Sequence, residues 1–414
     1  MLHTLDDSRA ISGSARIETL PLKQRVIPRA LPGQYPCGMS KLPQLQVTRT
    51  GSSLGSSNGD DAVRSLEDLV QRAEQAQASD VHLHLRGSVA EVAFRLDGVI
   101  TPTSGLPADI AERVLGRIKY LARLKTYQDS LPQDGRIDRH ELGTKNDIRV
   151  ATFPTVTGEK IVLRLFNSSV VLALPELELN PAAGRELENF LRRTSGLMLL
   201  TGPAGSGKTT TIYACLQQLA KTGGRQVITV EDPVEQILPG IMQTEVNEAR
   251  GLDFAKAARH LLRLDPQVLV IGEIRDEETA RLAVRAALTG HLVIATLHAG
   301  SCQGVFERLQ IMCADHSAIA ASVELVLNQR LVRKLCRECR GQGCASCLDT
   351  GYRGRLPLVE WLCLDAAARR HLVTQQRDAL VARPTLKEHA QALLQSGLTD
   401  AAELARVLGA DCPP

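Results

Sequence analysis

The sequence feature that most constrains this fold is a glycine-rich loop between an apolar segment and a helical one. Residues 202–209, Gly-Pro-Ala-Gly-Ser-Gly-Lys-Thr, fit the pattern G-x-x-x-x-G-K-[ST] in full. They follow the apolar residues 197–201 and open a segment with helical spacing at 208–221. A strand, a glycine-rich turn and a helix N-terminus form the context that a phosphate-binding loop requires. The chain is therefore predicted to bind the phosphates of a nucleotide.

This loop is expected to bind phosphate mainly through its backbone. Glycines let successive N–H groups turn toward phosphate oxygens, and the helix N-terminus adds a partial positive charge. Lys208 is expected to reach the β- and γ-phosphates, and the hydroxyl of Thr209 to bind Mg²⁺. The residues assigned to nucleotide binding are Gly202, Pro203, Ala204, Gly205, Ser206, Gly207, Lys208, Thr209 and Thr210.

The segments around the loop alternate between strand-like and helix-like patterns. Strands are predicted at 197–201, 226–231, 267–272 and 291–297, and helices at 208–221, 253–264 and 277–289. Runs such as residues 268–271 are apolar throughout, so they suit a parallel sheet that is covered on both faces. We predict an α/β, RecA-like phosphate-loop domain with a parallel sheet at residues 181–330.

A smaller domain is predicted at residues 61–171. The expected helices begin near 61 and at 108, and the expected strands lie at 81–85, 89–96, 147–153 and 160–166. Asp97-Gly98 follows the second strand and is a strong hairpin signal. These elements predict a small α+β, PAS-like domain, which a linker at 172–180 joins to the nucleotide-binding domain.

Residues 1–60 differ from the rest because Pro, Gly and Ser recur in them. They are interpreted as a flexible leader; the alternative is a short segment that docks to a partner. No segment approaches 18 consecutive apolar residues, and the N-terminus lacks the apolar stretch of a secretory signal. No transmembrane segment is therefore expected, and a cytoplasmic location is predicted.

Four of the ten cysteines are spaced as metal ligands. Cys336, Cys339, Cys344 and Cys347 form the pattern C-x₂-C-x₄-C-x₂-C. Two such pairs at short range suit a tetrahedral structural Zn²⁺ held by four thiolates. Residues 331–355 are therefore predicted to be a zinc-binding lobe, followed by a C-terminal helical region at 356–414. A redox-active pair and an iron–sulfur site are the alternatives.

Acidic residues stand at the ends of two predicted strands. Glu273 follows the strand at 267–272, and Glu231 ends the strand at 226–231, with Glu235 four residues later. Hydrolysis of ATP needs a carboxylate near the attacking water or the metal. Acidic residues at strand ends are common without any catalytic role, but beside a complete phosphate loop they favour a hydrolase.

Six motifs follow one another along the chain: residues 78–84, residues 131–137, the phosphate loop, residues 231–235, residues 272–276 and residues 290–298. In this order they resemble the motifs of the GspE/PilB family of secretion ATPases, which power type II secretion and type IV pilus assembly. The last three resemble the family's Asp box, Walker B segment and His box. The resemblance implies an ATP-hydrolysing motor that forms a homo-hexameric ring. It also implies peripheral association with the inner membrane through platform proteins of the secretion or pilus machinery.

The resemblance assigns roles to single side chains. Glu273 would polarise the attacking water, and Glu231 and Glu235 would support metal and water. His298 would sense the γ-phosphate, with His291 as a weaker candidate. The arginines that would complete the catalytic site are Arg136 and Arg149 from the small domain and Arg259 and Arg263 before the Walker B strand. Such arginines can accelerate phosphoryl transfer by about 10³–10⁵.

Composition bears on two competing hypotheses. Lys plus Arg number 49 against 46 for Asp plus Glu, a net charge of +3, and aromatic residues make up 3%. A RecA-like nucleic-acid translocase would need basic grooves or stacking aromatics, so no nucleic acid is expected. The intact set of Lys208, Glu273 and the arginines argues against a nucleotide-gated scaffold that binds ATP without turnover. The expected cofactors are ATP, Mg²⁺ and Zn²⁺.

The cysteine cluster bears on which branch of the family this chain resembles, and the leader bears on its membrane partner. Retraction ATPases of the pilus system generally lack the four cysteines, so the cluster favours the assembly and secretion branch. Many family members dock to their membrane partner through a folded N-terminal domain. The segment before residue 61 is too short, and too rich in Pro, Gly and Ser, to form such a domain. The identity of that partner is therefore left open.

Overall fold

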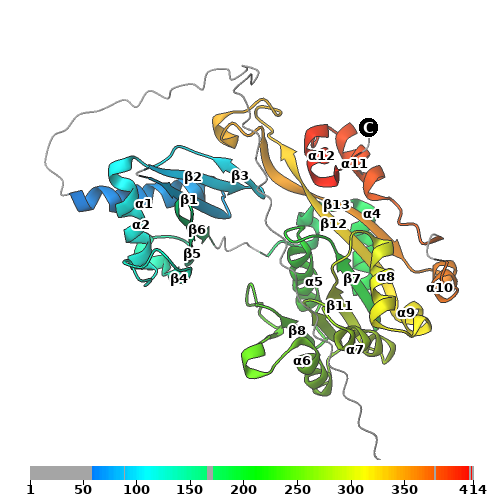
Figure 1. The fold of residues 1–414 in the computed structure, drawn as a ribbon. Coiled ribbons are helices and arrows are strands. Elements are labelled where there is room, and N and C mark those ends of the chain that lie inside the picture. The colour runs from blue at the N-terminus through cyan, green and yellow to red at the C-terminus, as the bar shows by residue number, and fades with distance from the viewer. Residues whose placement is uncertain (1–57, 88, 166–170, 377–378, 410–411, 413–414) are drawn as a thin grey trace, which may run out of the picture. The chain divides into compact units, whose positions relative to one another are not determined.

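The computed structural model describes residues 58–412, apart from 88, 166–170, 377–378 and 410–411. The expected leader at 1–60 lies almost entirely outside the described residues. The described part contains a small sheet with two long helices, a larger sheet with helices on both faces, and a helical tail (Figure 1).

The small domain is a six-stranded antiparallel sheet with the strand order β3-β2-β1-β6-β5-β4. Its strands are β1 (Asp80–Arg86), β2 (Val89–Leu96), β3 (Val99–Pro102), β4 (Gln133–Ile137), β5 (Ile148–Thr155) and β6 (Gly158–Leu165). Helices α1 (Asn58–Gln75) and α2 (Ala108–Leu121) share one apolar core with the sheet, and α3 (Arg139–Leu142) is a single turn.

The predicted helices and strands of this domain are present, and two further strands, β3 and β4, appear. Asp97 and Gly98 form the two-residue turn between β2 and β3 with φ of 49° and 86°, a conformation that suits Gly and Asp. Strand β4 was not predicted because its sequence, Gln-Asp-Gly-Arg-Ile, is polar and only Ile137 is buried. It belongs to the motif at 131–137.

The larger domain is built on a seven-stranded sheet with the strand order β13-β12-β7-β11-β10-β8-β9. Its strands are β7 (Gly196–Thr201), β8 (Val227–Glu231), β9 (Met242–Glu245), β10 (Val268–Ile271), β11 (Leu292–Thr296), β12 (Val323–Leu335) and β13 (Tyr352–Cys363). Neighbouring strands from β12 to β9 are parallel, and β13 alone is antiparallel to its neighbour. The sheet is therefore mixed, where a parallel one was predicted.

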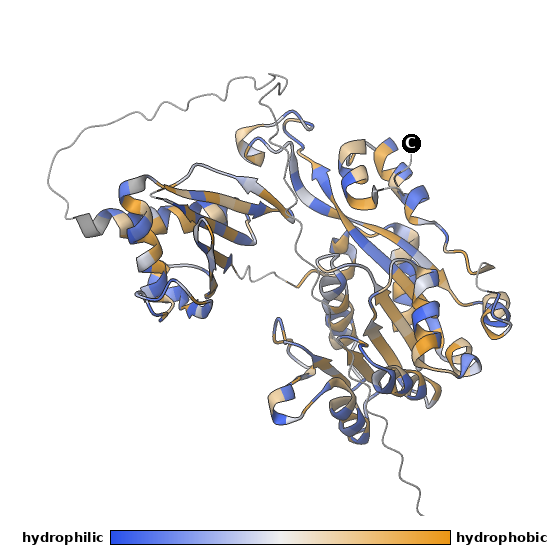
Figure 2. Cartoon of the chain, in the orientation of Figure 1, coloured by the Kyte–Doolittle hydropathy of each residue, from blue (hydrophilic) through white to orange (hydrophobic). Residues whose placement is uncertain are grey.

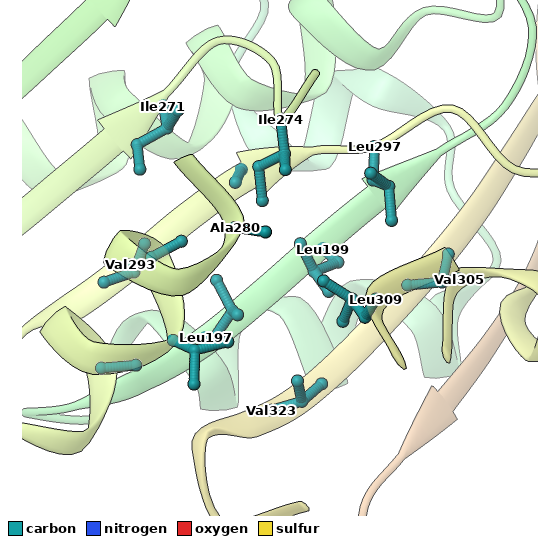
Figure 3. Packing of buried hydrophobic residues seen from close by; sticks show 14 of the residues in the cluster. Leu197, Leu199, Ile271, Ile274, Ala280, Val293, Leu297, Val305, Leu309 and Val323 are labelled. Atoms are coloured by element: carbon teal, nitrogen blue, oxygen red, sulfur yellow. The ribbon is translucent and has the colours of Figure 1, made fainter. Parts of the chain in front are cut away.

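Helices cover both faces of this sheet, as its apolar strands predict. They are α4 (Pro181–Leu191), α5 (Lys208–Thr222), α6 (Phe254–Leu261), α7 (Glu277–Leu288), α8 (Cys302–Met312) and α9 (His316–Ser322). Leu197 and Leu199 of β7 face a core shared with Ala280 of α7 (Figure 3). Met198 and Leu200 face the opposite core with α4 and α5. Because alternate side chains of β7 face the two cores, every residue of this strand is buried. Figure 2 shows the apolar strands of the sheet between partly polar helices.

The C-terminal third differs from the sequence expectation. Strand β12 runs through residue 330, where the nucleotide-binding domain was expected to end, and the four cysteines lie in the connection from β12 to β13. Residues 356–363 were assigned to a helical region, but they belong to β13. The helical tail begins after it with α10 (Ala366–Val373), α11 (Leu386–Gln395) and α12 (Ala401–Leu408). Short 3-10 turns stand at Leu174–Leu177, in the expected linker, and at Glu248–Arg250, Leu262–Leu264 and Ala345–Cys347.

A buried carboxylate fastens the tail to the sheet. Glu403 of α12 is fully buried. It accepts hydrogen bonds from the backbone N–H and the Nε of Arg333 on β12, at 2.9 and 2.8 Å, and from Nε of Arg406 at 2.8 Å. Burial alone would raise the pKa of Glu403, but the hydrogen bonds from Arg406 and Arg333 hold it below its ordinary value.

We expect Glu403→Ala to destabilise the protein by about 3 kcal/mol, because the change leaves a half-buried guanidinium without its partner. Equilibrium denaturation measures this change. In the matched control Glu277→Ala, which removes an exposed pair with Arg281, the loss is below about 0.5 kcal/mol. Since the pKa of Glu403 is lower in the folded state, its contribution is present above about pH 4.3 and is lost as the pH falls further. Equal effects of the two variants contradict this account.

Candidate functional site

The phosphate loop leaves β7 at Thr201 and enters α5 at Lys208. Gly202, Gly205 and Gly207 adopt φ of 139°, 73° and 89°, which residues with a Cβ rarely adopt. The ammonium of Lys208 donates hydrogen bonds to the carbonyls of Gly202 and Pro203 at 2.9 and 3.0 Å. Burial lowers the pKa of Lys208, and the Glu273 carboxylate raises it in part. The loop therefore holds a partly desolvated cation among its own carbonyls.

Glu273 and His298 meet at the edge of the sheet where the parallel strands end. Glu273 follows β10 and His298 follows β11, and Oε1 of Glu273 lies 2.9 Å from Nε2 of His298. The other oxygen of Glu273 accepts a bond from Nε of Arg275 at 2.7 Å, and Arg275 also contacts Asp232 at 3.1 Å. Both side chains of the first pair are partly exposed. A carboxylate with a histidine and an arginine beside it can orient a water molecule and respond to an added anion.

Glu231 lies at the end of β8 and is buried. Its two oxygens accept bonds from the hydroxyls of Tyr213 and Thr229, both at 2.5 Å, and from the amide of Gln243 at 3.1 Å. The Tyr213 oxygen in turn accepts the backbone N–H groups of residues 235 and 236, at 3.1 and 3.3 Å. The side chain of Glu235 is exposed. Glu231 therefore organises the segment that carries Glu235.

Tyr213 was not predicted as a functional residue. It lies in the second turn of α5, where its apolar body is part of the core and its hydroxyl reaches the end of β8. Burial and the hydrogen bond to Glu231 raise the pKa of Tyr213 well above its ordinary value, so the hydroxyl keeps its proton and donates it. No motif marks such a residue, because its position depends on how α5 packs against the sheet.

The arginines of the small domain are neighbours in its sheet. Arg136 of β4 lies directly opposite Arg149 of β5, and Arg149 lies opposite Arg164 of β6. Arg136 pairs with Asp147. Like charges in directly opposite positions destabilise a sheet. Asp147 beside Arg136 and Asp80 beside Arg164 offset part of this charge, and the three arginines are exposed on one face of the sheet.

The other predicted site residues lie on α5, on α6 and the turn after it, and directly before β11. Arg259 on α6 pairs with Glu278 at the start of α7, and Arg263 is exposed on the turn after α6. Nδ1 of His291 lies 3.0 Å from the carbonyl oxygen of Ala286, which favours a structural role for this histidine. The hydroxyl residues Thr209 and Thr210 are exposed on the first turn of α5, beside Lys208.

The four cysteines gather at the end of the β12–β13 hairpin, where their sulfur atoms all lie within 4.8 Å of one another. The backbone N–H of Gly343 donates to the sulfur of Cys339 at 3.2 Å. Burial raises the pKa of Cys347, but backbone N–H bonds from Cys344 and Gly351 bring it down to about 7. Because thiolates bind metals, the arrangement is consistent with a zinc site.

Among the described residues, no helix combines the length and the apolar character needed to cross a bilayer.

The glycine-rich loop, the acidic strand ends and the sheet edge on which they converge define a phosphate-loop nucleotide hydrolase. Residues 57–408 match the family model described as type II/IV secretion system protein, and the chain belongs to that family. It is thus a secretion ATPase of the type that serves type II secretion and type IV pilus assembly, and the resemblance stated from its motifs is confirmed.

Several relatives share most of this chain. HxcR of Pseudomonas aeruginosa, a type II secretion system protein, is 40% identical over 375 residues, which are 86% of this chain and 79% of the relative. Type II secretion system protein E of Klebsiella pneumoniae is 36% identical over 392 residues, 87% and 79% of the two chains. The pilus assembly ATPase PilB of Thermus thermophilus is 35% identical over 365 residues, 81% of this chain and 41% of PilB.

Two solved structures share the fold. The pilus retraction motor PilT with bound ADP has a TM-score of 0.59 at 26% identity, covering 81% of this chain and 95% of PilT. The Legionella pneumophila ATPase DotB has a TM-score of 0.64 at 20% identity, covering 82% and 94%. The α/β fold with its mixed sheet is thus one that known ATPases share.

We expect Tyr213→Phe to lower kcat for ATP by about 10- to 100-fold, because small displacements of catalytic groups have costs of this size. The change removes one hydroxyl, so Glu231 loses one of its three hydrogen bonds and the N–H groups of residues 235 and 236 lose their acceptor. Steady-state ATPase assays measure the effect.

Tyr352→Phe is the matched control. Its hydroxyl also donates to a carboxylate, that of Asp400 at 2.7 Å, but in the tail. It should lower stability and leave kcat unchanged. A Tyr213→Phe variant that hydrolyses ATP at the wild-type rate would contradict the role given to this hydroxyl.

Proposed function

We propose that this protein is the ATP-driven motor of a type II secretion or type IV pilus assembly system. It works as a homo-hexameric ring in the cytoplasm, held at the inner membrane by platform proteins. The observation that carries the proposal is the pairing of Glu273 with His298 beside a complete phosphate loop. The relatives at 35–40% identity support the same assignment.

In this proposal the side chains at the sheet edge divide the chemistry. Glu273 accepts hydrogen bonds from the attacking water and polarises it. His298, 2.9 Å from that carboxylate, links the position of Glu273 to the γ-phosphate. Lys208 leaves the carbonyls of Gly202 and Pro203 for the β- and γ-phosphates, where its charge stabilises the transition state.

The remaining residues hold the nucleotide and its metal. The backbone of the phosphate loop and the hydroxyls of Thr209 and Thr210 surround the phosphates. Bound Mg²⁺ would neutralise phosphate charge, with Thr209 as a ligand and Glu231 and Glu235 supporting the metal and water. The arginines that respond to the negative charge are Arg136, Arg149, Arg259 and Arg263.

Motion follows from the change in phosphate charge. Arg136 and Arg149 stand opposite each other on β4 and β5, so the greater negative charge of a triphosphate attracts them more strongly than a diphosphate does. Loss of the γ-phosphate weakens this attraction, and the small, PAS-like domain shifts relative to the nucleotide-binding domain in a hinge-type change. In a ring, successive shifts of this kind drive the platform proteins.

We expect Glu273→Gln to lower kcat by about 10²–10⁴-fold while nucleotide affinity stays near wild type, since a general base contributes to the chemical step. The control is Glu277→Gln, which changes an exposed residue four positions along the chain and should keep full activity. ATPase assays and ADP titrations measure the two quantities.

Three outcomes would argue against the motor. A wild-type ring with no Mg²⁺-dependent ATPase activity would exclude it. Binding of ATP without turnover would favour a nucleotide-gated scaffold, and stimulation by single-stranded DNA would favour the nucleic-acid translocase.

For the cysteine cluster we propose structural zinc. Elemental analysis of the purified protein should find about one zinc per chain. Cys347→Ser should lose that metal and lower the melting temperature, whereas Cys363→Ser, an exposed cysteine outside the cluster, should keep it. Iron with acid-labile sulfide would identify an iron–sulfur site, and protein without metal would contradict the zinc assignment.

A further inference from the structure

Strand β12 borders both the phosphate loop and the cysteine cluster. It pairs in parallel with β7 as far as Asn328, which lies opposite Thr201, the last residue of β7. At this point the chain of β7 turns into the phosphate loop, while β12 continues beside β13 to Leu335 (Figure 1). Cys336, the first of the four cysteines, follows directly.

Gln329 is the residue of β12 that meets the phosphate loop. It is 3% exposed. Its amide nitrogen donates to the carbonyl of Ser206 at 2.9 Å, and its amide oxygen accepts from the hydroxyl of Thr211 on α5 at 2.9 Å. Both halves of one amide thus hold the end of the loop and the start of the helix that together receive the phosphates.

The loop packs so closely on Gln329 that it has no space for side chains. A Cβ added to Gly202 would lie 2.2 Å from the backbone oxygen of Gln329, and one added to Gly207 would lie 2.6 Å from its amide nitrogen. The position of Gln329 therefore sets where the loop backbone can lie, and with it the direction of the loop N–H groups.

The other end of β12 leads directly into the cysteine lobe and is also bound by the tail, through Arg333 and Glu403. The backbone N–H of Cys336 donates to the carbonyl of Gly351 at 2.8 Å, across the base of the lobe. From Gln329 to Cys336 the strand spans about 23 Å at its usual rise per residue. In small metal lobes the free energy of metal binding is also free energy of folding, so a bound metal would stiffen this end of the strand.

We propose that Gln329 is a positioning residue for the phosphate loop and that β12 couples metal binding at the four cysteines to nucleotide binding. The coupling rests on the zinc site proposed above. Without metal, the lobe end of β12 loosens, the Gln329 amide loses its alignment with Ser206 and Thr211, and the loop N–H groups turn away from the phosphates. Such coupling is reciprocal, so nucleotide also tightens metal binding.

The test measures the Kd of ADP by calorimetry in the presence of excess Mg²⁺. Gln329→Leu should raise this Kd about tenfold and Thr211→Val about threefold, since they remove two hydrogen bonds and one. Gln310→Leu is the matched control: Gln310 of α8 is also buried, and its amide atoms have no hydrogen-bond partner among the described residues. It should change Kd less than about twofold even where it changes the melting temperature.

The same titration with and without metal tests the coupling. A zinc-selective chelator should raise the wild-type Kd of ADP by about three- to tenfold, and restored zinc should reverse this. In Gln329→Leu the chelator should have little further effect. An equal effect of the chelator in both proteins would overturn coupling through Gln329. A protein that binds no metal would also overturn the coupling, and elemental analysis would show it.

The positioning role has its own decisive outcome. If Gln329→Leu binds ADP as the wild type does, the role is wrong; if that variant fails to fold, wild-type affinity in Thr211→Val overturns it. Because these measurements are binding constants for ADP, they do not depend on turnover. If the protein has no ATPase activity but the variants show the expected rises in Kd, the motor function is wrong and the positioning role of Gln329 stands.

Discussion

The arrangement of the site depends on the close approach of the phosphate loop to β12. At the end of β7 the chain leaves the sheet beside β12. A Cβ at Gly202 or Gly207 would clash there with atoms of Gln329. The glycines therefore serve two purposes: they permit the positive φ values of the loop, and they let its backbone lie against Gln329. This contact fixes the position of the loop backbone.

The parallel strands bring the remaining groups to the same edge. Strands β7, β8, β10 and β11 all end there, and they deliver the phosphate loop, Glu231, Glu273 and His298 from positions far apart in the sequence. This is the edge at which open α/β sheets bind their ligands. Helix α5 adds Tyr213, which joins the start of the loop helix to the acidic segment after β8.

The sequence predicted the parts that depend on local pattern. The phosphate loop is contiguous, and the strand before it is apolar because both of its faces are covered, so the strand, the loop and the helix lie where the pattern predicts them. Strands β4 and β9 are short and polar, and their pairing depends on the sheets around them. The pair β12–β13 was missed because charged residues such as Arg330 and Arg333 interrupt the apolar pattern and the cysteine lobe separates the partners. Gln329 contacts Thr211 across 118 residues, and no local motif reports such a contact.

The bonds of Lys208 indicate why loop geometry controls affinity. Its ammonium, partly removed from water, is satisfied by two loop carbonyls. A nucleotide must replace these bonds with bonds to phosphate, which are stronger because both partners are charged. The free energy gained by Lys208 on nucleotide binding is the difference between its bonds to phosphate and its bonds to the loop carbonyls. This gain requires that the loop N–H groups also point at the phosphate oxygens. A small rotation of the peptide at Ser206 would lose some of those N–H bonds while the carbonyl bonds of Lys208 remained. The amide of Gln329, which holds that peptide, therefore influences affinity more than its distance from the phosphates would indicate.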